Sequence, residues 1–189
     1  MTRSPAQKIS DILICLSILA LIAEALLLPW INALAYFRYN LPKAMTFQEL
    51  MAIFEYDFDD GLGNLFGIFL ASWSHLSTTV LSLFLWTVAV CGALILIQGI
   101  RILSSIADGT PFSPKNSRSL RRAGGACFVM AASTLGRTVF TLCQEGFPAL
   151  ASYTTFLVPL FAMAGLLCLV FSALFRQAAE MKAENDLTI

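Results

Sequence analysis

The pattern of apolar and polar positions along this 189-residue chain is dominated by four long apolar stretches. A helix needs roughly 20 apolar residues to cross a bilayer core about 30 Å thick. Each stretch reaches that length with at most one charged residue inside it. The stretches span residues 12–31, 77–100, 123–143 and 153–175. The sequence therefore predicts an all-α, polytopic membrane protein, a bundle of four transmembrane helices.

Composition agrees with this prediction. Hydrophobic residues make up 58% of the chain and charged residues 13%, whereas an ordinary soluble domain has about 25% charged residues. The formal net charge is zero, which argues against a surface that binds nucleic acid directly. The length suits one domain. We therefore expect residues 1–189 to form a single transmembrane domain in the lipid bilayer, with a homo-oligomer left open.

Basic residues indicate the side of the membrane that each loop occupies, because cytosolic loops carry an excess of Lys and Arg. With four spans, nine basic residues share one side, and Arg38 and Lys43 lie on the other, in the outer segment at residues 36–74. Both termini, the inner loop at residues 101–122 and the tail at residues 176–189 are therefore expected in the cytosol. A bacterial cytoplasmic (inner) membrane fits this arrangement. The nine residues are Arg3, Lys8, Arg101, Lys115, Arg118, Arg121, Arg122, Arg176 and Lys182.

The first apolar stretch has a second interpretation, as a cleaved signal peptide. Arg3 and Lys8 supply a positive start, and Ala33-Leu34-Ala35 resembles a cleavage site. The apolar run is longer than the usual core of a signal peptide, however, and it contains Glu24. We therefore expect a retained transmembrane helix.

The outer segment contains a predicted short amphipathic helix. Thr46 and Glu49 have the spacing of a capping box, in which each side chain bonds the backbone of the other. The apolar residues that follow share one helical face, so the helix is expected on the bilayer surface or over the bundle as a lid. These residues are Phe47, Leu50, Met51 and Phe54.

An acidic run, Glu55 to Asp60, comes next and resembles a calcium-binding loop only superficially. Such a loop needs a bidentate Glu at its twelfth position, and counting from Asp57 that position is Ile68. A solvated acidic surface is the favoured interpretation.

The inner loop predicts a basic helix that continues into the third span. Ser113 followed by Pro114 is a typical helix start, because Ser caps the helix and Pro suits its first position. On that helix Lys115, Arg118 and Arg122 share a face, with Arg121 alongside. This basic face suits contact with anionic lipid headgroups. It also suits docking of an acidic protein segment, such as the acidic residues of the tail: Glu180, Glu184 and Asp186.

Two ionisable residues, Glu24 and Arg137, fall inside predicted spans. Charged groups at such positions are costly and usually pair with one another or line a cavity. A helical rise of 1.5 Å per residue puts both at a similar depth, in the outer half of the bilayer. We therefore predict an intramembrane ion pair, either a structural clasp between helices or a polar pocket or switch.

The five cysteines are expected to be free and buried. All lie in apolar stretches, the number is odd and no two are closer than sixteen residues, which fits neither a disulfide framework nor a metal site. The residues are Cys15, Cys91, Cys127, Cys143 and Cys168.

Two segments of the chain resemble a known family. They are Gly109-Thr110-Pro111-Phe112-Ser113, with the basic helix after it, and the closing segment that runs from Phe175-Arg176 to Asp186-Leu187-Thr188-Ile189. The sequence resembles the bacterial four-helix membrane proteins of domain-of-unknown-function family 2975, best from about Leu85 to the end. The family has no settled activity. Its members are often encoded beside a small helix-turn-helix regulator, so the resemblance implies such a regulator as a cytosolic partner.

Three classes of function remain to be compared. An enzyme is the least expected, because His75 is the single histidine and no phosphate-cradling or nucleophile-elbow motif occurs. No cofactor or metal is expected. A membrane-tethered sensor or binding protein that engages a cytosolic partner is favoured by the capped basic helix and the defined tail. A transporter or channel subunit, with Glu24 and Arg137 in its pathway, is the alternative, although no internal repeat is apparent.

Overall fold

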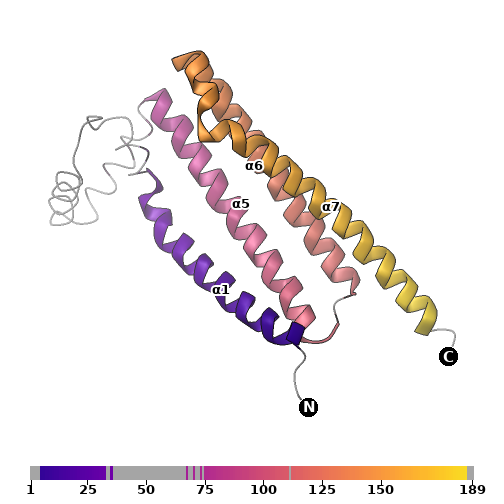
Figure 1. Ribbon diagram of the computed structural model, residues 1–189. Helices are drawn as coiled ribbons and strands as arrows, with labels where there is room; N and C mark the ends of the chain where they lie inside the picture. The colour runs from indigo at the N-terminus through magenta and orange to yellow at the C-terminus, as the bar shows by residue number, and fades with distance from the viewer. Residues whose placement is uncertain are drawn as a thin grey trace. The chain divides into compact units, whose positions relative to one another are not determined.

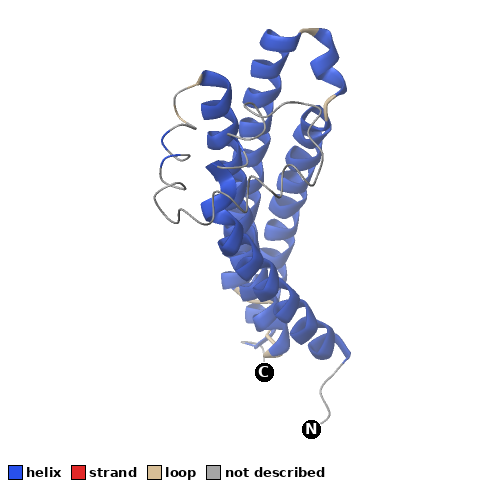
Figure 2. Ribbon diagram, turned by 90° about the vertical axis from the view of Figure 1, so that its left-hand side faces the viewer, coloured by secondary structure: helices blue, strands red, loops and turns tan. Residues whose placement is uncertain are grey.

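Helices account for every described element of the protein. The computed structural model describes residues 5–32, 35, 67, 70, 73, 75–110 and 112–186, and Figure 2 shows helices and no strand within them. Four helices in this part are long and apolar enough to cross a membrane. The described part of the chain is therefore all-α, and its four apolar helices indicate a multi-pass membrane protein, as the sequence predicted. The elements are α1 (Pro5–Leu27), η1 (Leu28–Trp30), α5 (Leu76–Ala107), α6 (Pro114–Glu145), η2 (Phe147–Ala151) and α7 (Tyr153–Asp186).

Contacts within the chain divide it into two units. One unit joins residues 1–25 to residues 87–189, and the other holds residues 26–86. The first unit thus contains most of α1, the greater part of α5, and all of α6 and α7. The candidate sites described below lie within this first unit.

Helices α6 and α7 are longer than the spans expected from their apolar stretches. They contain 32 and 34 residues, which corresponds to about 48 and 51 Å of helix at 1.5 Å per residue. A hydrocarbon core of about 30 Å cannot contain either helix completely. Because η2 joins them in an antiparallel pair (Figure 1), the start of α6 and the end of α7 lie at the same end of that pair.

The start of α6 is capped as the sequence predicted. Ser113 lies outside the helix in an extended conformation, and its Oγ accepts a hydrogen bond of 3.2 Å from the backbone N–H of Lys115. Pro114 occupies the first turn, where its missing N–H leaves no helical hydrogen bond unmade. The predicted continuation from the inner loop into the third span is therefore confirmed as one unbroken helix.

Small residues bring α6 and α7 close together. Gly124 faces the backbone oxygen of Gly165, so closely that a Cβ at Gly124 would lie 3.1 Å from this oxygen. The ring of Phe128 fills the space beside Gly165 in the same way. Helices in membranes associate largely through this kind of close packing of small residues.

A reciprocal serine pair adds hydrogen bonds to the same interface. The Ser117 hydroxyl donates to the Ser172 carbonyl oxygen, and the Ser172 hydroxyl donates to the Ser117 carbonyl oxygen, both at 2.8 Å. Both serines are buried. Polar side chains that bond across helices in this way stabilise membrane bundles modestly.

Helix α5 packs against the α6–α7 pair through an apolar cluster. Cys91 from α5 is buried with Ala126 and Met130 from α6, and Phe161 from α7 packs against them. Within the first unit, α6 and α7 therefore share one core with the part of α5 that begins at Thr87.

Polar side chains attach α1 to α5. The Gln7 amide donates to the carbonyl oxygen of Ala107 at 3.0 Å, and the Ser10 hydroxyl donates to that of Leu103. Most of the large apolar side chains of α1 are exposed, which suits a helix surrounded by lipid.

The second unit holds the end of the first span and the start of α5. Its described residues include Asn32, which is buried and accepts a hydrogen bond of 3.2 Å from the Trp86 indole N–H. The predicted amphipathic helix at Thr46 to Phe54 and the acidic run at Glu55 to Asp60 lie outside the described residues. Both stay predictions.

The cysteines are free, but the expectation that all of them are buried is wrong. Cys91 and Cys127 are buried and Cys168 is half-buried, whereas Cys15 and Cys143 are exposed on their helices. Apolar sequence context could not separate the two cases, because a helix in a membrane presents apolar side chains to lipid as well as to its neighbours.

Candidate functional site

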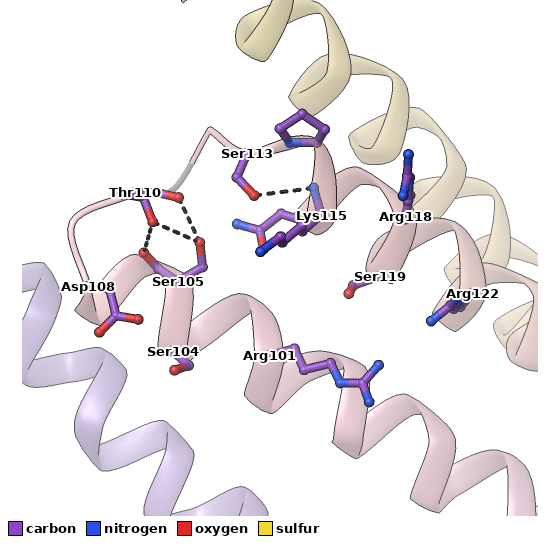
Figure 3. Close-up of a pocket in the computed structure, with 12 residues that line it drawn as sticks. Arg101, Ser104, Ser105, Asp108, Thr110, Ser113, Lys115, Arg118, Ser119 and Arg122 are labelled. Carbon is purple, nitrogen blue, oxygen red and sulfur yellow. Dashed lines mark hydrogen bonds between the residues drawn. The ribbon is translucent and has the colours of Figure 1, made fainter.

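A polar pocket of about 840 Å³ lies between the end of α5 and the start of α6 (Figure 3). We call it the basic pocket. Its lining combines side chains from both helices and from the turn that joins them, all within the first unit. The lining residues are Arg101, Ser104, Ser105, Asp108, Thr110, Ser113, Pro114, Lys115, Asn116, Arg118, Ser119 and Arg122.

Positive charge dominates the basic pocket. Four cationic side chains line it, and Asp108 is the one acidic residue among its lining residues. The start of α6 adds to this potential, because the first backbone N–H groups of a helix carry a partial positive charge. The four cationic residues are Arg101, Lys115, Arg118 and Arg122.

The turn between α5 and α6 gives the basic pocket its shape. Gly109 has a φ of 75°, a conformation that glycine adopts without strain. The chain then turns back so that the N–H of Thr110 donates to the Ser105 carbonyl oxygen at 2.9 Å. The Ser105 hydroxyl donates in turn to the Thr110 carbonyl oxygen at 2.7 Å. These hydrogen bonds satisfy backbone groups at the end of α5 and stabilise the turn that precedes α6.

A second hollow, of about 650 Å³, lies between α6 and α7. We call it the α6–α7 groove. Its charged lining residues are Arg118 and Arg121 from α6, and Arg176 and Glu180 from α7. Small residues of α7 line the same hollow: Ser172, Ala173, Ala179 and Ala183. The groove is therefore basic along α6 and lined largely by small side chains along α7.

An ion pair lies on the α7 side of this groove. The Arg176 Nε donates to Glu180 Oε1 at 2.8 Å, one helical turn away. Both side chains are largely exposed, and exposed pairs of this spacing contribute little to stability. The pair therefore serves to orient its two side chains more than to hold the fold together.

The predicted basic face of α6 divides between the two hollows. Lys115, Arg118 and Arg122 line the basic pocket, and Arg121 lines the α6–α7 groove together with Arg118. Adjacent residues lie about 100° apart around a helix, so Arg121 and Arg122 diverge. Docking of another molecule on this face stays a prediction.

The predicted acidic tail is part of α7. Glu180 lines the α6–α7 groove, Glu184 is exposed, and Asp186 is the last residue of the helix. Docking of Glu184 and Asp186 onto the basic face remains a prediction.

Several residues of the basic pocket were not predicted as site residues. Arg101, Ser104, Asp108 and Thr110 were expected only as parts of an inner loop, although Arg101 contributed to the orientation argument. The sequence feature that could have indicated these residues is the Asp-Gly-Thr-Pro turn. A chain reversal there brings the end of one helix beside the start of the next. Which side chains then share a pocket depends on the rotation of each helix, which the sequence does not specify.

The intramembrane charges occupy different helices of the first unit. The Glu24 carboxylate lies against α5, where a Cβ at Gly92 would be 2.8 Å from Glu24 Oε1. The absence of a side chain at Gly92 therefore admits the carboxylate to the α5 backbone. Arg137 is half-buried on α6. Pairing between Glu24 and Arg137 stays a prediction.

The described residues contain no group of three metal-ligating side chains. No curated protein and no solved structure matches the chain. A family model described as a protein of unknown function, DUF2975, matches residues 28–189. The match includes α5, α6 and α7, and with them both the basic pocket and the α6–α7 groove. It covers most of the 189 residues, and the chain therefore belongs to the DUF2975 family of proteins of unknown function.

Proposed function

We propose that the protein is a membrane-tethered binding protein of a bacterial cytoplasmic membrane that holds a cytosolic partner protein. Both termini and the inner loop lie in the cytosol in this proposal, as the distribution of basic residues favours. The observation that supports it best is the α6–α7 groove. The groove lies at the start of α6 and in the later part of α7, where charged residues adjoin the apolar stretches.

The chemistry of the α6–α7 groove suits an acidic amphipathic helix. Ala173, Ala179 and Ala183 leave room for the backbone of a partner helix, because their side chains are short. Arg118 and Arg121 along the opposite wall attract carboxylates. A helix that enters a groove in this way is a common mode of peptide recognition.

The family resemblance supplies a candidate partner, a small helix-turn-helix regulator. Tethering such a regulator to the membrane would control how much of it is free in the cytosol. The partner would contribute an acidic helix, and its contact with nucleic acid would not involve this chain. A change in the outer segment or the membrane could then alter the affinity of the groove, which is what a sensor requires.

Charge reversal in the groove is expected to release the partner. Arg121→Glu combined with Arg176→Glu would place like charges against an acidic helix, and we expect binding to weaken at least tenfold. The measurement is the amount of regulator, or of any other soluble protein, that co-purifies with the mildly solubilised chain and rebinds after separation.

A matched control is Lys8→Glu together with Lys182→Glu, which makes the same change in net charge with residues that line neither hollow. This control should retain the partner. An equal loss in both double variants would contradict docking in the groove. Ion or solute flux through liposomes containing the purified chain, with no soluble partner retained, would instead assign the protein to transport.

A further inference from the structure

We propose that the basic pocket between α5 and α6 binds a phosphate-bearing anion. This site adjoins the α6–α7 groove, with which it shares Pro114 and Arg118, and its existence does not depend on the proposed partner. The proposal rests on the pocket's volume of about 840 Å³, its excess of cationic side chains and the serine residues that line it. A volume of that size accommodates a lipid headgroup or a nucleotide-sized molecule.

The pocket has more cationic than acidic side chains, four against Asp108. Arg101, on α5, faces a wall that carries Lys115 and Arg122 on α6, with Arg118 at the boundary shared with the groove. Within the described part of the chain, none of these four cationic groups forms an ion pair with a carboxylate. Like charges that converge on one space repel each other, so an anion bound there relieves repulsion as well as forming new contacts.

The fork of an arginine guanidinium can donate paired hydrogen bonds to the oxygens of a phosphate. Arg101 and Arg122 line the pocket from different helices (Figure 3), so a phosphate bound there would have a guanidinium group from each of two helices in its surroundings. The hydroxyls of Ser104 and Ser119 line the same space and add neutral donors. Several donors from several directions match the several acceptor oxygens of a phosphate.

The position of the two arginines fits the edge of the membrane. Arg101 directly follows the predicted span at residues 77–100, and Arg122 directly precedes the one at residues 123–143. Both guanidinium groups are therefore expected at the depth of the phosphates of the cytosolic leaflet. Either an anionic lipid headgroup or a soluble phosphate compound presents the required chemistry there.

Two arms of one experiment distinguish these sources. The full chain is placed in nanodiscs of phosphatidylcholine alone, and pyrophosphate is titrated by calorimetry. In parallel, retention of phosphatidylglycerol against phosphatidylcholine is measured by native mass spectrometry of the detergent-solubilised chain. We expect selective binding in at least one arm. Arg101→Gln and Arg122→Gln should each weaken it roughly tenfold or more, because each removes a charge-assisted contact to the phosphate.

Lys182→Gln is the control, since it removes one exposed cationic group from α7 without touching the pocket. It should leave binding within about twofold, because an exposed charge away from the site acts only through screened attraction. Selective retention of phosphatidylglycerol would identify a lipid headgroup, and pyrophosphate binding a soluble ligand. Equal losses in Arg101→Gln and Lys182→Gln, or no binding in either arm, would overturn the proposal. Unchanged thermal unfolding of the variants shows that they are folded.

Discussion

Gly124→Leu is expected to destabilise the protein strongly. A Cβ at this position would lie 3.1 Å from the Gly165 carbonyl oxygen and 3.2 Å from the Cys168 Cβ. The first of these contacts is with backbone, which cannot move aside without separating α6 from α7. Overpacking of this kind typically costs about 1–3 kcal/mol and sometimes more. We expect the temperature of unfolding in detergent to fall by several degrees.

Gly125→Leu is the matched control for this prediction. A Cβ at Gly125 would meet nothing within 4 Å, and leucine favours a helix over glycine by somewhat less than about 1 kcal/mol. The control should therefore be neutral or slightly stabilising. Unfolding can be followed with a thiol-reactive dye, because Cys91 and Cys127 are free and buried in the folded protein. Equal effects of the two substitutions would show that α6 and α7 do not pack at Gly124.

Glu24→Gln and Arg137→Gln are each expected to lower stability. Removing one member of a buried ion pair leaves the other charge uncompensated, at a cost of about 3–5 kcal/mol in soluble proteins. The cost is smaller in a membrane, since long side chains and water defects relieve part of it. If the two residues are partners, the double variant should recover part of the loss, because two amides can bond each other. Thermal unfolding of the four proteins gives the coupling energy.

Additive losses would contradict this pairing. The contact between Glu24 and α5 would then be the one to test. The Glu24 carboxylate occupies the space that a side chain at Gly92 would need. Gly92→Ala should then displace it, and Glu24→Gln would have little further effect in that background. Gly99→Ala is the control on the same helix, because a side chain there meets nothing within 4 Å.

The transmembrane helices were predictable from the sequence because their signal is composition over a long window. Four apolar stretches of sufficient length could be recognised without knowing how they pack. The start of α6 was also predictable, since Ser113 and Pro114 act locally on the backbone. Chain reversal at Gly109 followed from the same local chemistry.

The ends of α6 and α7 could not be predicted from hydrophobicity alone. The predicted spans end where charged residues begin. A helix, however, continues until a Gly, a Pro or a capping residue ends it. Between residue 123 and Pro114, no residue ends the helix. After Phe175, neither Gly nor Pro interrupts α7 before Asp186. Hydrophobicity therefore located the membrane spans, whereas the helices followed local backbone preference.

The two hollows could not be predicted because they depend on rotation and separation of helices. The basic face of α6 was identified as one surface, yet Arg121 and Arg122 line different hollows. The glycines that set the α6–α7 distance, Gly124 and Gly165, resemble any other glycine in the sequence until their neighbours are known. The sequence identifies the charged and polar residues of both hollows. The packing of the helices determines which of these side chains line the same hollow.

Both proposed binding roles require the basic pocket and the α6–α7 groove to lie in the cytosol. A topology assay tests this location most directly, with a periplasm-active reporter and a cytosol-active reporter fused after Lys43, Arg118 or Ile189. We expect an outside location for the fusion after Lys43 and an inside location for those after Arg118 and Ile189. A cytosolic reporter after Lys43, with outside reporters at the other two positions, would contradict the orientation and both proposed binding roles.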